Sequence, residues 1–249
     1  MKRLLFFSVL VLALPACSPV YYAPSSQHVP LLTEEEEFTV AGNYVGANSV
    51  DGASLRAAYA LNSNWGLIGG GSLFFNEGSE DNSSNGSGGH FEAGGGYFTE
   101  VSNKFVFETY GLLGYGNMVN RFPQSIQDYP GTDGEIKANI LSLALQPAFG
   151  FKSKYFEAAI SLRTGMINYS GIRGDLMTQN DDQDAVGNQQ EYLKDNRSNL
   201  LFEPALTIRG GLEFLKIEAQ TGGSLNLTNK NFPQETSWLS IGLIYRFED

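Results

Sequence analysis

In the stretch Thr236-Ser-Trp-Leu-Ser-Ile-Gly-Leu-Ile-Tyr-Arg-Phe247, every second side chain from Leu239 onward is apolar, and those in between are mixed and include a charge. Successive side chains of a strand point to opposite faces, so this stretch would carry one almost wholly apolar face. That face holds Leu239, Ile241, Leu243, Tyr245 and Phe247, while Arg246 lies on the other. About 11 residues is also the length that a tilted strand needs to cross a bilayer. A soluble sandwich would bury the apolar face and a membrane barrel would turn it to lipid, and we favour the barrel.

Ten segments with strand patterns predict an all-β fold, an antiparallel transmembrane β-barrel of about ten strands. They are residues 38–49, 53–61, 65–75, 90–99, 104–118, 136–151, 155–168, 200–213, 216–227 and 236–247. From the second break onward short turns alternate with long loops, which is typical of barrels with short periplasmic turns and longer extracellular loops. An even number of strands returns both ends of the barrel to the periplasmic side. Eight strands is the alternative, if residues 38–61 form something less regular than two strands.

Two glycine triplets suggest how the third and fourth strands pair. Pairing residues whose numbers add up to 165 sets Gly69 opposite Gly96 and Gly71 opposite Gly94, and it closes the loop 76–89 at its own ends. Glycine inside a strand often marks a bend, so the triplets predict a place where the wall curves sharply or the lumen is crowded.

Aromatic residues gather near the predicted strand ends, as they do at the two interfaces of membrane barrels. Those near the short turns are Trp65, Tyr97, Phe98, Phe105, Tyr155, Phe156, Phe214, Tyr245 and Phe247. Those near the long loops are Phe74, Phe75, Tyr115, Phe122, Tyr169 and Phe232. This distribution predicts two aromatic girdles.

Residues 1–16 have the features of a secretory signal peptide, with two basic residues, an apolar run and small residues at the end. The run is too short for a membrane-spanning helix, so membrane insertion of the mature chain would have to use strands. Cys17 is the one cysteine of the chain, and an exported protein seldom keeps a single unpaired thiol. Leu14-Pro-Ala-Cys17 resembles a bacterial lipobox, which implies cleavage before Cys17 and diacylglycerol on its sulfur.

Residues 17–37 are expected to form a lipidated, extended tether before a barrel domain of residues 38–249. Pro19, Pro24 and Pro30 oppose regular structure in this segment. The four acidic residues at its end would repel one another and lie in water, and His28 is expected to be solvated as well.

The charge of the chain bears on its partners. Without the two basic residues of the signal peptide, the chain has 14 basic and 27 acidic residues, a net charge of about −13. Such a balance argues against a nucleic-acid partner and against a polybasic membrane-binding patch.

The tether and the first strands resemble a known family. The residues that carry the likeness are Tyr22-x-Pro24, Val29-Pro-Leu31 and Arg56-Ala-Ala-Tyr-Ala-Leu61, within about residues 14–75. They look like lipid-anchored outer-membrane β-barrel proteins of Bacteroidota, whose members mostly lack an assigned activity. The resemblance implies a bacterial outer-membrane location, with the lipid bilayer as the partner. Surface-exported lipoproteins of such bacteria often carry acidic residues just after the cysteine. This chain does not, which implies an anchor in the periplasmic leaflet.

Nine charged residues fall on the polar faces of seven predicted strands. They are Arg56, Glu92, Glu108, Glu157, Arg163, Glu203, Arg209, Glu218 and Arg246. An Arg facing lipid at mid-bilayer would cost roughly 2–4 kcal/mol, and buried carboxylates need partners. We therefore expect an interlocked Glu/Arg network that fills the lumen and leaves a rigid cylinder in place of an open pore. Because Arg neighbours would keep the Glu side chains ionised, the set suits structure better than acid–base catalysis.

Few other residues point to chemistry. His90 lies close to Ser87 and shares a face with Glu92, the residue types of a hydrolytic triad, although closeness in sequence does not establish triad geometry. Asp181, Asp182 and Asp184 suggest a calcium loop but lack its glycine spacing and terminal Glu. We therefore predict no metal site and no catalytic residue.

These observations favour a non-enzymatic outer-membrane barrel lipoprotein with a filled lumen. Its role would be structural in the envelope, or that of an accessory subunit in a complex with other outer-membrane proteins. One alternative is a narrow channel for small solutes past Arg163 and Arg209. A second is a lipid-modifying enzyme centred on His90, and a third is a soluble periplasmic barrel held by its lipid.

Overall fold

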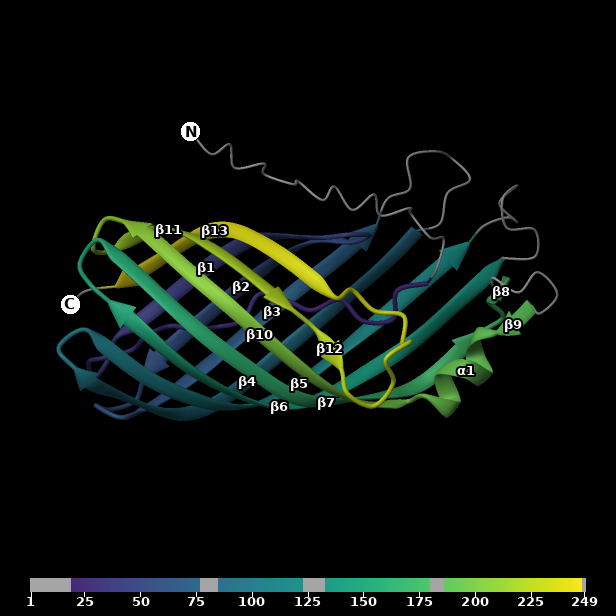
Figure 1. Cartoon of the computed structure of the whole chain (residues 1–249), viewed down its shortest axis with the longest axis horizontal. Coiled ribbons are helices and arrows are strands. Elements are labelled where there is room, and N and C mark those ends of the chain that lie inside the picture. The colour runs from purple at the N-terminus through teal and green to yellow at the C-terminus, as the bar shows by residue number, and fades with distance from the viewer. Residues whose placement is uncertain (1–18, 77–84, 123–132, 180–185, 248–249) are drawn as a thin grey trace, which may run out of the picture.

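The alternation of residues 236–247 recurs in ten strands, which pair into one closed antiparallel barrel (Figure 1). The computed structural model describes residues 19–76, 85–122, 133–179 and 186–247. Consecutive wall strands pair with each other, and β13 closes the sheet by pairing with β1 and β11. The wall strands are β1 (Phe38–Ala47), β2 (Asp51–Ala60), β3 (Trp65–Asn76), β4 (Asn85–Ser102), β5 (Phe105–Phe122), β6 (Gly134–Lys152), β7 (Phe156–Gly174), β10 (Ser198–Gly211), β11 (Leu215–Gly223) and β13 (Ser237–Phe247). A closed sheet has no unpaired edge.

Smaller elements lie at the end of the barrel that carries the long loops. β12 (Leu225–Asn226) continues the wall beside β10, and β8 (Met177–Gln179) pairs with β9 (Val186–Asn188). The short helix α1 (Gln189–Asp195) begins where the Asn188 side chain accepts hydrogen bonds from the backbone N–H groups of Gln190 and Glu191. In the part of the chain that the structure describes, no helix has the length and apolarity to cross a membrane.

The prediction of ten strands is confirmed, and the alternative of eight is wrong. β1 and β2 are regular and pair from Phe38 opposite Tyr59 to Gly46 opposite Asp51. The strands β4 to β7 have 18 or 19 residues and are longer than predicted. Since about 9–11 residues suffice to cross a bilayer, these strands extend beyond a membrane of ordinary thickness.

The predicted register between β3 and β4 is wrong. The structure pairs Gly69 with Ala93 and Gly66 with Gly96, so the paired numbers add up to 162. Paired residues of neighbouring strands share a face, and an odd sum would have set inward residues opposite outward ones. The observed register keeps Glu92 inside, opposite Gly70.

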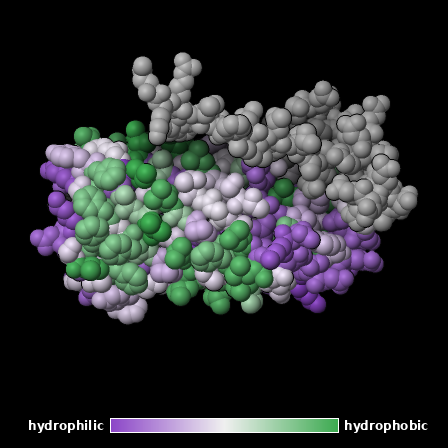
Figure 2. Space-filling view, in the orientation of Figure 1, coloured by the Kyte–Doolittle hydropathy of each residue, from purple (hydrophilic) through white to green (hydrophobic). Residues whose placement is uncertain are grey.

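The orientation of the side chains is that of a membrane barrel. Leu239, Ile241 and Leu243 are 62%, 60% and 52% exposed on the outer surface, whereas Arg163 and Glu203 are buried inside. On the face drawn in Figure 2, hydrophobic residues gather over the strands and hydrophilic residues gather toward the two ends. A water-soluble barrel would bury the apolar face, so this arrangement matches the transmembrane β-barrel predicted.

The prediction of two aromatic girdles is right for some residues and wrong for others. Trp65 and Tyr155 near the short turns and Phe75 and Tyr115 near the long loops are exposed on the outside. The exceptions are buried inside the barrel: Phe98, Phe122, Tyr169 and Phe232. They pack there against the N-terminal segment or beside it.

The N-terminal segment corrects the expectation of a solvated tether. Residues 19–33, which we call the plug, run lengthwise through the barrel (Figure 1), and most of them are buried. His28, expected in water, is 3% exposed in the lumen. Tyr21, Val29, Leu31 and Leu32 belong to three apolar clusters that the wall completes. Burying such side chains stabilises the plug by roughly 1.5–3 kcal/mol each, which a tether in solvent would forgo.

Candidate functional site

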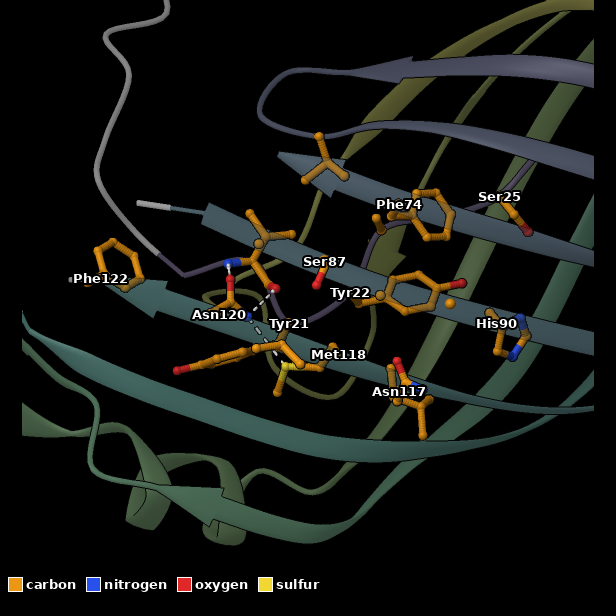
Figure 3. Close-up of a pocket in the computed structure, with 18 residues that line it drawn as sticks. Tyr21, Tyr22, Ser25, Phe74, Ser87, His90, Asn117, Met118, Asn120 and Phe122 are labelled. Atoms are coloured by element: carbon orange, nitrogen blue, oxygen red, sulfur yellow. Dashed lines mark hydrogen bonds between the residues drawn. The ribbon is translucent and has the colours of Figure 1, made fainter. Parts of the chain in front are cut away.

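The candidate site is the lumen with its plug. Figure 3 shows the first residues of the plug, with Tyr21 and Tyr22 close to Asn120 and Met118. There Asn120 of β5 binds Val20 twice: its Oδ1 accepts from the backbone N–H at 3.1 Å, and its Nδ2 donates to the carbonyl at 2.9 Å. The backbone N–H of Tyr21 donates to the Pro233 carbonyl at 2.9 Å. The Tyr22 carbonyl accepts from the Glu235 N–H at 2.9 Å. The plug is thus tied by its backbone both to the wall and to the loop before β13.

Tyr21 anchors this end of the plug. Its hydroxyl donates to Gln189 Oε1 at 2.5 Å, and its carbonyl accepts from the Tyr169 hydroxyl at 2.9 Å. Its ring lies against those of Tyr192 and Phe232, with centroids 6.3 Å and 5.8 Å away. Burial raises the pKa of Tyr192, which belongs to α1 outside the wall, so its phenol stays protonated.

In the middle of the lumen, side chains of the wall bind the plug backbone as a neighbouring strand would. Gln220 of β11 accepts from the Gln27 N–H at 2.6 Å and donates to the Gln27 carbonyl at 3.1 Å. Arg56 of β2 donates to the same carbonyl. The Gln27 side chain in turn donates to the Glu203 carbonyl at 2.7 Å. Backbone groups buried in a lumen need such partners, and here wall side chains supply them.

The next residues of the plug are held in the same way. Gln146 Nε2 donates to the His28 carbonyl and Arg209 Nη2 to the Val29 carbonyl, each at 2.6 Å. Glu108 Oε2 accepts from the Leu31 N–H at 3.0 Å. Leu31 has a φ of 52°, a left-handed conformation that is unfavourable for a bulky residue. The surrounding contacts therefore fix the plug in one path.

Most of the lumen charges form one chain of ion pairs around the second half of the plug. Glu218 pairs with Arg56 at 2.5 Å and with Arg209 at 2.7 Å. Arg209 also pairs with Glu157 at 2.8 Å, and Glu157 pairs with Arg246 at 3.2 Å. These five side chains come from five strands and are almost wholly buried. Each of these charged side chains has an oppositely charged neighbour, as buried charges require.

A second, smaller cluster lies nearer the long loops. Arg163 of β7 pairs with Glu92 of β4 at 3.0 Å and stands 4.0 Å from Glu203 of β10. Glu203 also accepts hydrogen bonds from the hydroxyls of Tyr22 at 3.0 Å and Ser224 at 2.9 Å. Tyr22 links this cluster to the plug.

The structure thus turns all nine predicted charges inward and brings eight of them into ion pairs. Glu108 differs, because its carboxylate binds the plug backbone. Sequence reasoning missed Glu37, Lys152 and Lys216. Glu37 pairs with Lys152 at 3.0 Å and with Arg246, and Lys216 pairs with Glu157 at 3.0 Å.

These three residues lie at strand ends, where Glu37 looked like part of a solvated acidic run. A usable signal was the alternation itself, because Lys216 shares a face with Glu218.

The alternative of a triad formed by Ser87, His90 and Glu92 finds no support in the contacts of these residues. His90 Nε2 lies 3.0 Å from the hydroxyl of Ser142, which belongs to β6. Glu92, the acid of that triad, pairs with Arg163. His90, Glu92 and Ser142 line a cavity of about 20 Å³ together with Tyr22.

Larger cavities lie at the two ends of the plug. One of about 70 Å³ flanks Val20 to Tyr22 at the long-loop end (Figure 3), and Tyr22 and His90 both line it. One of about 980 Å³ opens at the short-turn end, bounded by residues 33–38 and by Lys152, Lys216 and Arg246. Between them lies the plug. Cys17 and the three acids of the predicted calcium motif fall outside the described residues.

No family model matches the chain, and no curated protein matches it. Several solved structures are similar to the chain at low sequence identity. Ail, the attachment invasion locus protein of Yersinia pestis, shares 13% identity over 86% of this chain and 99% of its own, with a TM-score of 0.36. The translocator domain of the autotransporter NalP from Neisseria meningitidis shares 10% over 86% and 90%, with a TM-score of 0.46. The transport unit of the autotransporter AIDA-I from Escherichia coli shares 10% over 90% and 93%, with a TM-score of 0.42.

Proposed function

We propose that the protein is a non-enzymatic lipoprotein of the bacterial outer membrane, a plugged barrel with a structural or accessory role in the envelope. The observation that carries this proposal is the plug, whose backbone is bound by wall side chains from Val20 to Leu31. A barrel whose lumen is filled by a segment of the same chain is suited to the role of a rigid scaffold in the membrane. The resemblance of residues 14–75 to lipid-anchored Bacteroidota barrels agrees with the location.

The same observation argues against the narrow channel. A solute path past Arg163 and Arg209 would have to cross a lumen in which Arg209 is 1% exposed and bonded to the plug. In planar bilayers we expect the intact protein to carry no steady current. A variant lacking residues 19–33 should conduct, because the wall side chains then face an empty lumen.

The matched control replaces the exposed residues Glu34, Glu35 and Glu36 by Gln, directly after the plug. This variant should stay silent. Folding of all three proteins is checked by heat-dependent mobility on gels. Steady conductance of the intact protein would refute the plugged state.

Lipidation is the second part of the proposal. A diacylglyceryl group would pass from a phospholipid to the Cys17 sulfur, forming a thioether, while the thiol proton leaves with the phosphate headgroup. Water would then hydrolyse the Ala16–Cys17 peptide bond. Labelling of the cells with palmitate tests this step, since the label should be lost in Cys17→Ala. Because the outer surface is apolar, this variant should still need detergent for extraction, whereas a soluble barrel held by its lipid would wash off.

A further inference from the structure

The plug runs through the barrel in one defined direction, from one end of the lumen to the other. Its first residues, Val20 to Tyr22, bind Asn120 and the loop between β12 and β13, at the end where the long loops leave the wall. Its last residue, Thr33, is 2.7 Å from Lys152 Nζ, and Glu37 pairs with that same lysine. Lys152 ends β6 at a short turn, so the plug runs from the long-loop end to the short-turn end.

The length of the plug fits a complete crossing. An extended chain advances about 3.3 Å per residue, so Val20 to Thr33 can span roughly 40 Å. This is comparable with a bilayer including its headgroup regions, about 40–45 Å. β1 then starts at Phe38, opposite Phe247, and leads back into the wall from the short-turn end.

The contacts of the plug also fix its polarity. Gln220 and Glu108 accept from the N–H groups of Gln27 and Leu31, whereas Gln146 and Arg209 donate to the carbonyls of His28 and Val29. Pro24 and Pro30 have no N–H to satisfy. A segment threaded in the opposite direction would meet these groups in a different order, with buried donors and acceptors left unpaired.

We propose that the N-terminus of the mature protein lies on the extracellular side of the outer membrane. Long loops face outward and short turns face the periplasm in such barrels. The proposal rests on the lipoprotein function above, and it specifies that function further. Cys17 precedes Pro19 by only two residues, so a lipid on its sulfur would enter the outer leaflet, at the cell surface. This proposal differs from the periplasmic anchor that the lack of acidic residues directly after Cys17 implies.

An epitope placed between Ser18 and Pro19 tests the side directly, because it leaves Cys17 and the plug intact. Antibody binding is compared between intact and permeabilised cells. Two matched insertions calibrate the assay, one between Asn103 and Lys104 in a short turn and one in the long loop between β3 and β4. The N-terminal epitope should bind in intact cells about as well as the long-loop epitope, and at least tenfold better than the short-turn epitope. Binding that appears only after permeabilisation would overturn the proposal.

A second variant covers the case in which the insertion blocks folding. Ser18→Cys is treated with a membrane-impermeant maleimide on intact cells, with Asn103→Cys as the periplasmic control. Ser18→Cys should react and Asn103→Cys should not, and the reverse result contradicts the proposal. Palmitate labelling of the same strains reports lipidation separately. Loss of the lipid with an exposed N-terminus would therefore contradict the lipoprotein proposal alone.

Discussion

At the scale of single residues, Arg209 holds the centre of the lumen together. It pairs with Glu157 and Glu218 and donates to the Val29 carbonyl, and it is 1% exposed. It therefore joins β7, β11 and the plug to its own strand, β10. Removal of the Arg209 side chain would take one positively charged partner from each of two buried carboxylates, those of Glu157 and Glu218.

We predict that Arg209→Ala destabilises the protein by about 3–5 kcal/mol, the range for breaking a buried pair. Urea unfolding in detergent, followed by gel mobility, measures the change. Lys154→Ala is the control, because Lys154 pairs with Glu213 at the surface, where both side chains are about half exposed. A pair of that kind contributes about 0–1 kcal/mol. Equal losses in the two variants would show that the buried network adds little stability.

At the scale of elements, the plug and β2 make a contact that can be locked. The hydroxyls of Ser26 and Ser54 lie 2.8 Å apart, and both side chains are buried. A double variant, Ser26→Cys with Ser54→Cys, should form a disulfide in folded protein, since the side chains already meet.

The disulfide is detected as a shift in gel mobility after unfolding without reductant. Pairing Ser54→Cys with Ser18→Cys serves as the control and should give no shift, because Ser18 precedes the plug. Failure of the first pair to link, in protein that is otherwise folded, would contradict the threaded position of the plug.

The wall could be predicted from the sequence and the plug could not. Alternation is a local property, so ten strands and their inward charges follow from residues that are close in the chain. The same rule places Phe98 with Glu92, Phe122 with Glu108 and Tyr169 with Arg163, all on the inner faces. The prediction of two aromatic girdles was therefore wrong for these three residues, because the alternation of side chains along each strand already places them inside the barrel.

The plug has no such periodicity. Residues 19–33 contain three prolines and mixed polar and apolar side chains, a composition typical of an extended linker. Its burial depends on Asn120, Gln220 and Gln146, which are far away in the sequence. For the same reason the roles of His28 and Glu37 were missed. Only the closed barrel brings their surroundings together.

At the scale of the whole molecule, the apolar character of the outer surface distinguishes a membrane barrel from a water-soluble one. Ile241 lies in the middle of β13 and is 60% exposed. Ile241→Arg should cost roughly 2–4 kcal/mol in lipid, because the charge would face hydrocarbon.

Leu61→Arg is the matched control, since Leu61 is also exposed but lies in the short turn after β2. There the cost should fall to about 0–1 kcal/mol. Folding into lipid vesicles, titrated with urea, measures both. If the two variants lost the same small amount of stability, the apolar belt would not face a bilayer.

A chain that passes through its own barrel limits how the protein can be made. If its N-terminus carries acyl chains, that end is too bulky to pass through a barrel of ten strands that has already closed. The sheet must then wrap around the segment while it is still open, and the seam between β1 and β13 is the natural place to close it, since β1 follows the segment directly. The machinery that inserts this protein must therefore handle an open, curved sheet that already surrounds the N-terminal segment.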